Sequence, residues 1–192
     1  MKSAEIIDRH LRLVEACHHD LQSFVAAVAE RIGATFARGG RVLACGNGGS
    51  AADAQHFAAE LVGRFVRARR ALPALALTTD TSTLTAIGND FGFERIFARQ
   101  VEAHGREGDL LLAISTSGNS PNVLEAARCA HQQGMSIVAL TGEGGGRLAA
   151  AADVLLAVPS TDVARIQEVH ELALHAIVAI VEERLDPTEP HT

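Results

Sequence analysis

The sequence predicts an α/β fold, a doubly wound five-stranded parallel sheet with long helices at the N- and C-terminal ends of the chain. Three observations support this prediction. Of the 192 residues 47% are hydrophobic, short β-rich runs alternate with Ala-rich helical stretches, and two of the runs end in loops of Gly, Asn and Ser. The alternation is typical of βαβ units, whose parallel strands are covered by helices on both faces. A chain of this length can enclose one core, so we expect a single domain over residues 1–192.

The N-terminal segment is predicted to be helical. Apolar residues recur at helical spacing through residues 3–37, as at Phe24 and Val28, and Gly39 ends the segment. The segment forms either one long helix or two. An α/β core over residues 41–160 is expected to follow it.

The core is predicted to alternate strands with helices. The predicted strands are 42–45, 74–78, 110–115, 137–141 and 154–158. The predicted helices are 50–66, 82–101 with a break near Gly88, 121–133, 146–152 and the long C-terminal helix 163–185. In the flavodoxin-like order 2-1-3-4-5, the first and third strands are neighbours at the topological switch point, where such sheets bind their ligands.

The composition argues against several classes of function. With 17 basic and 23 acidic residues the net charge is −6, so no broad cationic face is available for nucleic acid or an anionic membrane. Lys2 is the only lysine, whereas Schiff-base, pyridoxal and P-loop chemistries each need a fixed lysine in the site. The three cysteines form no CxxC motif, and no uncharged stretch approaches the roughly 18 residues of a membrane span. We therefore expect a cytoplasmic protein with neither nucleic acid nor a membrane as partner.

The run STSGNS at residues 115–120 is the strongest candidate for a ligand site. It follows a predicted strand and leads into a helix, with Ser120 placed as the N-cap and Pro121 at the first helical position. Hydroxyl groups and free backbone amides at a helix N-terminus form an anion cradle that needs no lysine. Ser120 alone would indicate only an ordinary capped turn, but the whole run favours a phosphate site.

A second loop of similar composition, residues 47–50, follows the first predicted strand. Its glycines would let a ligand approach the backbone closely, and Asp53 stands at capping-box distance from Ser50. The loop is either a sugar-binding turn or only a tight turn with a cap. The triple glycine at residues 144–146 is interpreted as a flexible turn.

Three polar residues share one face of the predicted helix 50–66. Asp53, His56 and Glu60 are separated by three and four residues. Because His56 and Glu60 are one turn apart, they could place an imidazole nitrogen and a carboxylate on one metal ion. The alternative is a solvated, salt-bridging face, which is the more common role of such a pair, and the position beside a phosphate crevice strengthens the case for a metal site.

His175 lies within an apolar run, LALHAIVAIV, of the predicted helix 163–185. A histidine there loses hydration unless it finds a partner, so it is either a hydrogen-bonded core residue or a ligand. Periodicity alone favours the core. At the end of the helix that carries Glu60 we expect a solvated group of four arginines, Arg64, Arg67, Arg69 and Arg70.

Four stretches of the chain resemble a known family. The stretch STSGNSPNVLEAARCAHQQGMSIVALTG resembles the sugar isomerase (SIS) domain family, and CGNGGSAADAQHFAAELVGRF, LTAIGNDFGFERIFARQV and ARIQEVHELALH resemble its phosphoheptose isomerases. The resemblance extends from about residue 5 to residue 185. It implies a cytosolic homotetramer that interconverts sedoheptulose 7-phosphate and D-glycero-D-manno-heptose 7-phosphate, an early step toward the heptose of lipopolysaccharide core.

The resemblance also implies roles for individual residues. The family's zinc ligands match His56, Glu60, Gln167 and His175, with one Zn²⁺ per subunit. Its substrate contacts match Asn47, Gly48, Gly49, Asn89, Asp90, Ser115, Thr116, Ser117, Ser120 and Gln167. Its catalytic acid and base match Glu60 and His175, which replaces the core interpretation of His175. Some members carry an aspartate before the RIQ run, where this chain has Ala164.

The reaction that the resemblance implies is an aldose-ketose isomerisation through an enediol. We expect Glu60 to take the carbon-bound proton and His175 to act on the oxygen side, with zinc polarising the carbonyl. Gln167 and His175 are eight residues apart, about 12 Å along a helix, which is a long reach for one metal ion. We therefore predict that the site is completed across a subunit interface of the tetramer.

Two other functions are compatible with parts of the sequence. A noncatalytic SIS protein that binds the replication initiator would share stretches such as SAADAQHFAA, but that relative lacks the residues corresponding to Glu60 and His175. A sugar-phosphate-sensing regulatory domain usually accompanies a DNA-binding module, for which the length and the acidic balance leave no room. The isomerase is therefore the favoured prediction.

Overall fold

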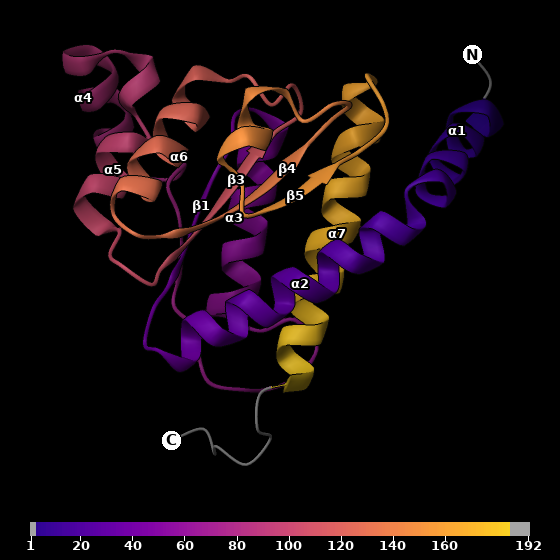
Figure 1. Ribbon diagram of the computed structural model, residues 1–192, viewed down its shortest axis with the longest axis horizontal. Coiled ribbons are helices and arrows are strands. Elements are labelled where there is room, and N and C mark those ends of the chain that lie inside the picture. Colours follow the sequence, from indigo (N-terminus) through magenta and orange to yellow (C-terminus); the bar gives the residue numbers. More distant parts are fainter. Residues whose placement is uncertain (1–2, 185–192) are drawn as a thin grey trace.

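The computed structural model describes residues 3–184, and its sheet has five parallel strands in the order β2-β1-β3-β4-β5 (Figure 1). The strands are β1 (Val42–Cys45), β2 (Ala74–Ala76), β3 (Leu110–Ser115), β4 (Ser136–Thr141) and β5 (Val154–Ala157). Leu43 of β1 pairs with Leu75 of β2 on one side and with Leu111 of β3 on the other. The predicted fold class and strand order are confirmed.

Helices connect the strands and form both ends of the described chain. They are α1 (Ser3–Ala16), α2 (His18–Ala37), α3 (Gly49–Val62), α4 (Thr81–Phe91), α5 (Ala98–His104), α6 (Pro121–Gln132) and α7 (Val163–Arg184). Two short 3₁₀ helices, η1 (Phe93–Arg95) and η2 (Gly146–Ala151), complete the set. Lys2 and the predicted last helical residue, 185, lie outside the described residues.

Several predicted boundaries differ from the observed ones. The N-terminal segment is two helices that meet at Cys17. The predicted break near Gly88 is wrong, because Gly88 continues α4 and the chain leaves that helix at Gly92, whose φ of +89° favours glycine. The predicted helix 50–66 begins at Gly49 and ends four residues early, at Val62.

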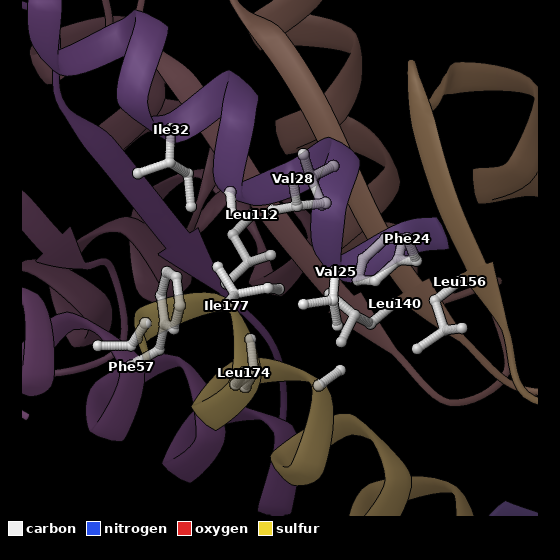
Figure 2. Packing of buried hydrophobic residues seen from close by; sticks show 14 of the residues in the cluster. Phe24, Val25, Val28, Ile32, Phe57, Leu112, Leu140, Leu156, Leu174 and Ile177 are labelled. Atoms are coloured by element: carbon white, nitrogen blue, oxygen red, sulfur yellow. The ribbon is translucent and has the colours of Figure 1, made fainter. Parts of the chain in front are cut away.

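The two faces of the sheet bury separate clusters. Strand residues alternate between them: Leu110 and Leu112 face α2, α3 and α7, whereas Leu111 packs toward α5 and α6. Figure 2 shows side chains of α2, α3, α7 and the sheet meeting on the first face, among them Phe57 and Ile177. In this packing α3 contacts α7, and the histidine-carboxylate cluster described below lies along their contact.

Within residues 3–184, every helix is too short or too polar to span a bilayer. Helix α1 projects from the rest of the fold (Figure 1), and none of its residues is buried.

Candidate functional site

The loop 115–120 lies at the carboxyl end of β3, as the sequence predicts. Ser115 Oγ and Ser120 Oγ are 3.0 Å apart, and the Gly118 N–H donates to Ser115 O at 2.8 Å. Among the described residues, no acceptor is found for the backbone N–H groups of Ser117 and Ser120. Ser120 is the N-cap of α6 and Pro121 its first residue, although the Ser120 side chain bonds to Ser115 and caps no N–H group. The loop therefore offers hydroxyls and amides to an anion.

The triple glycine 144–146 supports this loop. Gly118 has a φ of +63°, and a Cβ there would overlap the carbonyl oxygen of Gly145. The Leu148 N–H donates to Gly118 O at 2.9 Å, and the Arg147 N–H donates to the Asn119 side chain at 3.1 Å. The sequence indicated only a flexible turn here, whereas the structure shows a turn packed backbone to backbone against the candidate phosphate loop.

The second loop is joined to the start of α6, just after the first loop, by a pair of side-chain amides. The side chain of Asn47 donates to that of Asn122 at 2.9 Å, and Asn122 donates back at 2.8 Å. Asn122, buried at the start of α6, was missed by sequence reasoning, although its place beside the STSGNS run was a usable signal. The predicted capping box of Ser50 and Asp53 is wrong, because Gly48 is the N-cap of α3.

A cavity of about 410 Å³ lies beside the second loop. It is lined by Gly46, Asn47, Gly48, Ala51, Thr78, Leu84, Thr85, Gly88, Phe93, Ile96 and Phe97. Asn89 and Asp90 stand next to this lining at the end of α4, exposed, with the Asn89 amide donating to the Asp90 carboxylate at 2.7 Å. The structure thus places the predicted residues of both loops and of α4 around the carboxyl ends of β1 and β3.

A second group of predicted residues meets between α3 and α7. His56 Nε2 and His175 Nε2 are 3.0 Å apart, and Glu60 Oε1 lies 3.2 Å from the first and 3.6 Å from the second. Glu60 Oε2 is buried without a hydrogen-bond partner in the described chain. Two imidazole nitrogens and a carboxylate at such distances are a donor set that Zn²⁺ accepts, so the residues present fit the predicted metal.

Gln167 does not join this group. Its amide lies at the start of α3, where a Cβ on Gly49 would overlap the amide nitrogen. The carboxylate beside the two histidines is instead that of Glu171, whose Oε1 is 3.3 Å from His56 Nε2 and 3.1 Å from His175 Nε2. Sequence reasoning gave Glu171 no role.

The buried histidine of α7 is His170. It is 0% exposed, and its Nε2 lies 3.0 Å from Thr141 O at the end of β4. Burial lowers the pKa of its imidazole to about 4 despite that hydrogen bond. His175, which periodicity placed in the core, has a side chain that is 41% exposed. The core interpretation of His175 was therefore wrong. The buried histidine is His170, little more than one helical turn earlier in α7.

Two carboxyl groups on α3 have raised pKa values. Burial, aided by the nearby Glu171 carboxylate and opposed by His56, raises the pKa of Asp53 to about 6. Burial also raises the pKa of Glu60, against the opposing effect of the two histidines. A carboxylate of raised pKa is a stronger base than an ordinary one, which suits proton abstraction near neutral pH.

A buried ion pair holds the chain that leaves α3. Arg69 Nε lies 3.1 Å from Glu182 Oε1, and the two side chains are 7% and 2% exposed. The Arg69 guanidinium donates to the carbonyls of Glu60 and Leu61 at the end of α3, while Glu182 accepts N–H groups from residues 65–67. Of the four arginines expected to be solvated, Arg69 has a side chain that is only 7% exposed, so that prediction is wrong for it. Arg64, Arg67 and Arg70 are exposed.

The ion pair of Arg69 and Glu182 also holds the segment that contacts His175. The segment that it holds carries Phe65, whose ring stacks on His175 with 5.5 Å between centroids and 27° between planes. Neither Phe65 nor Glu182 was identified from the sequence. The acidic Glu182 in the apolar run IVAIVEER was the available signal.

Comparisons of the chain with a family model, with curated relatives and with solved structures agree with one another. The SIS domain model matches residues 7–142. The phosphoheptose isomerase of Roseiflexus sp. (strain RS-1) is 59% identical over 161 residues, covering 84% of this chain and 82% of that protein. The phosphoheptose isomerase of Rhodospirillum rubrum is 53% identical over 172 residues, covering 88% and 92%. The solved structure of the Neisseria gonorrhoeae phosphoheptose isomerase matches with a TM-score of 0.89 at 49% identity, covering 94% and 96%.

These similarities bear on the alternatives left by the sequence. Each of the three relatives is named as an isomerase, and Glu60 and His175, which separate the enzymes from the initiator-binding relative in the resemblance, lie side by side. The noncatalytic alternative is not favoured. This chain belongs to the SIS domain family and, within it, to the phosphoheptose isomerases.

Proposed function

We propose that the protein interconverts sedoheptulose 7-phosphate and D-glycero-D-manno-heptose 7-phosphate. The observation that carries this proposal is the placement of Glu60 Oε1 3.6 Å from His175 Nε2 in a chain that is 59% identical to a phosphoheptose isomerase. An acid and a base at that separation can serve adjacent atoms of one sugar.

The reaction balances within the substrate. Conversion of the ketose to the aldose moves one proton from C1 to C2 and one from the C1 hydroxyl to the C2 oxygen, through an enediol. No oxidant or second substrate is needed. Glu60 carries the carbon-bound proton, for which its partly buried carboxyl of raised pKa is suited, and His175 carries the proton between the oxygens.

The loop 115–120 binds the phosphate in this proposal. Backbone N–H groups of Ser117 and Ser120 and the hydroxyls of Ser115 and Thr116 donate to the phosphate oxygens at the N-terminus of α6. The second loop, with Asn47, Gly48 and Gly49, and the α4 residues Asn89 and Asp90 contact the sugar hydroxyls, as does Gln167 beside Gly49.

Zinc is the proposed metal, one ion per subunit. His56, Glu60 and His175 provide donors at suitable distances, and Gln167 is the fourth ligand that the resemblance implies. When bound, Zn²⁺ supplies Lewis acidity that polarises the carbonyl and stabilises negative charge on the oxygen.

We further propose a cytoplasmic homotetramer acting in the synthesis of lipopolysaccharide heptose, with the site completed at a subunit interface. Two features support the assembly. Gln167 does not approach the histidines within one chain, and α1 presents Ile7 and Leu11, 58% and 59% exposed, on a helix that projects from the fold (Figure 1). A sugar-phosphate substrate needs neither nucleic acid nor a membrane as partner.

Incubation of zinc-loaded protein with sedoheptulose 7-phosphate, followed by proton NMR, tests the proposed activity. We expect the aldose 7-phosphate to accumulate to equilibrium, and unphosphorylated sedoheptulose to react poorly because it lacks the group that the loop 115–120 binds. A protein that binds the sugar phosphate without converting it would contradict the proposal and revive the noncatalytic alternative.

A further inference from the structure

Asn122 is a buried amide that has no role in the function proposed above. It is the second residue of α6, two positions after Ser120, and it is 2% exposed. A buried side-chain amide loses the hydration of its N–H donors and of its oxygen, so these groups need partners within the protein. The partner of Asn122 is Asn47, which lies 75 residues earlier in the chain, just beyond the carboxyl end of β1.

The hydrogen bonds of Asn122 fix the orientation of both amides. Its oxygen accepts the Val123 backbone N–H at 3.0 Å and the Asn47 side-chain N–H at 2.9 Å, and its nitrogen donates to the Asn47 oxygen at 2.8 Å. Because a backbone N–H only donates, the Asn122 atom that faces it must be the oxygen. The Asn47 amide is held in turn, since rotating it by half a turn would break both of its bonds to Asn122.

The fixed amide of Asn47 keeps hydrogen-bonding capacity for a ligand. Asn122 uses one of its two N–H donors and one lone pair of its oxygen. Within residues 3–184, no further hydrogen-bond partner of the Asn47 side chain is found, and Asn47 lines the cavity of about 410 Å³. A sugar hydroxyl both donates and accepts, so it matches the remaining N–H and lone pair of this amide.

We propose that Asn122 is a positioning residue for the sugar, which orients the Asn47 amide toward a hydroxyl of the bound substrate. The inference rests on the proposed function, in which Asn47 contacts the sugar and the loop 115–120 binds the phosphate. Asn122 belongs to the helix whose N-terminus forms the proposed phosphate site. The amide pair therefore sets where the sugar-binding loop stands relative to the phosphate.

A double-mutant cycle tests whether Asn122 acts through Asn47. With zinc-loaded, full-length protein, kcat/KM for sedoheptulose 7-phosphate is measured for wild type, Asn47→Ala, Asn122→Ala and the double variant. We expect Asn122→Ala to lower kcat/KM about 10–100-fold, because a displacement of about 1 Å can cost that much. In the Asn47→Ala background the same substitution should lower it less than about threefold. Equal losses in both backgrounds would overturn the proposal.

Inhibition by inorganic phosphate separates orientation of the sugar from damage to the phosphate loop. Without the Asn122 side chain, the Val123 N–H still donates to Ser120 O at 3.1 Å, so the start of α6 should keep its shape. The inhibition constant of phosphate for Asn122→Ala should therefore stay within about threefold of the wild-type value. An increase as large as the loss of kcat/KM would show that Asn122 only shapes the loop, and would contradict the proposal.

Gln132→Ala is the matched control. Gln132 is an exposed amide on the same helix, about 15 Å from Asn122 along its axis, so its removal should leave kcat/KM unchanged. Circular dichroism and thermal unfolding show whether each variant is folded. If Asn122→Ala does not fold, Asn122→Ser replaces it in the cycle, because its hydroxyl keeps the position polar and its shorter side chain does not reach Asn47.

Binding distinguishes this proposal from the proposed function. The same cycle is applied to the Kd of sedoheptulose 7-phosphate, measured by calorimetry after the sugar phosphate has reached equilibrium, and this readout needs no turnover. Coupling between Asn47 and Asn122 in a protein that does not convert the sugar would support the role of Asn122 and refute the proposed isomerase alone. Conversion of the sugar with additive effects of the two substitutions would refute the role of Asn122 alone.

Discussion

The two halves of the candidate site are built in opposite ways. The proposed phosphate loop is six consecutive residues, 115–120, at the junction of one strand and one helix. The histidine-carboxylate cluster joins α3 to α7, and its two histidines are 119 residues apart in sequence. A contiguous loop carries its chemistry in its own backbone, whereas the cluster depends on how two helices pack.

Their supports differ accordingly. The loop rests on backbone: Gly118 is pressed against the carbonyl of Gly145, and Leu148 donates to Gly118 O. The cluster rests on side chains, with Phe65 stacked on His175 and the segment around Phe65 held by Glu182. Changes in the first region should therefore alter substrate affinity, and changes in the second should alter turnover or stability.

The largest effect should follow Glu60→Gln. General base catalysis contributes about 10²–10⁴-fold, so kcat should fall by that factor. KM should change little, because the substitution leaves the proposed phosphate loop intact. Steady-state kinetics at saturating Zn²⁺ measures both constants. If kcat were retained, another residue would transfer the proton. The assignment of turnover to the histidine-carboxylate cluster would then be contradicted.

The next largest effect should follow Gly118→Val. The new side chain would collide with Gly145 and require a left-handed backbone, so the loop must change shape. Loss of two hydrogen bonds to a charged phosphate, at about 1.5 kcal/mol each, would raise KM about 100-fold. Gly144→Asn is the matched control, because Gly144 has a φ of +73° and open space around it. A normal KM in Gly118→Val would show that the loop does not bind the phosphate.

Glu182→Gln should lower stability more than affinity. Breaking a buried ion pair from one side typically costs about 3 kcal/mol, because Arg69 keeps its charge without a counterion. Urea unfolding measures the loss, and Glu183→Gln provides an exposed control on the same helix. Equal stability of the two variants would contradict the role given to the ion pair.

The same carboxylate makes stability depend on pH. Burial alone would raise the pKa of Glu182, but backbone N–H groups of Arg67, Phe65 and Val66, together with Arg69, outweigh it and lower the pKa below its ordinary value of 4.5. A lowered folded-state pKa stabilises the protein above pH 4.5, and this stabilisation is lost as pH falls through the folded pKa. Unfolding between pH 3 and 7, about the range that brackets this titration, should show a steeper acid loss in wild type than in Glu182→Gln.

The smallest effect should follow Phe65→Leu. A ring pair contributes about 0.5–1.5 kcal/mol beyond area burial, so loss of the stack on His175 should lower kcat about 2–10-fold. KM should stay unchanged. Phe65→Tyr, which keeps the ring, should restore most of the turnover; if it were as slow as Phe65→Leu, the stacking would not position His175.

The contrast also explains what the sequence could predict. Short β-rich runs, helix signals and the STSGNS run depend on neighbouring residues, and the sheet order and the loop position were predicted from them. The ion pair of Arg69 with Glu182 and the place of Glu171 depend on how α3 and α7 pack, which no local pattern encodes. The amide pair of Asn47 and Asn122 joins residues 75 positions apart and was missed for the same reason.

The two histidines of α7 show most clearly where prediction from local sequence patterns fails. His170 and His175 stand in similar sequence surroundings, and apolar periodicity placed the wrong one in the core. Their difference arises from what faces each of them: Thr141 of β4 for His170, and His56 of α3 for His175. The resemblance to a family corrected the interpretation before the structure supplied its physical reason.

The central claim is that Glu60 moves the carbon-bound proton of a sugar phosphate. Exchange of that proton with solvent deuterium tests this claim most directly. Sedoheptulose 7-phosphate is incubated in D₂O with zinc-loaded wild type and with Glu60→Gln, and proton NMR follows the signals at C1 and C2. We predict aldose formation and deuterium at these carbons with wild type, and neither with Glu60→Gln. Deuterium incorporation by Glu60→Gln at the wild-type rate would contradict the account.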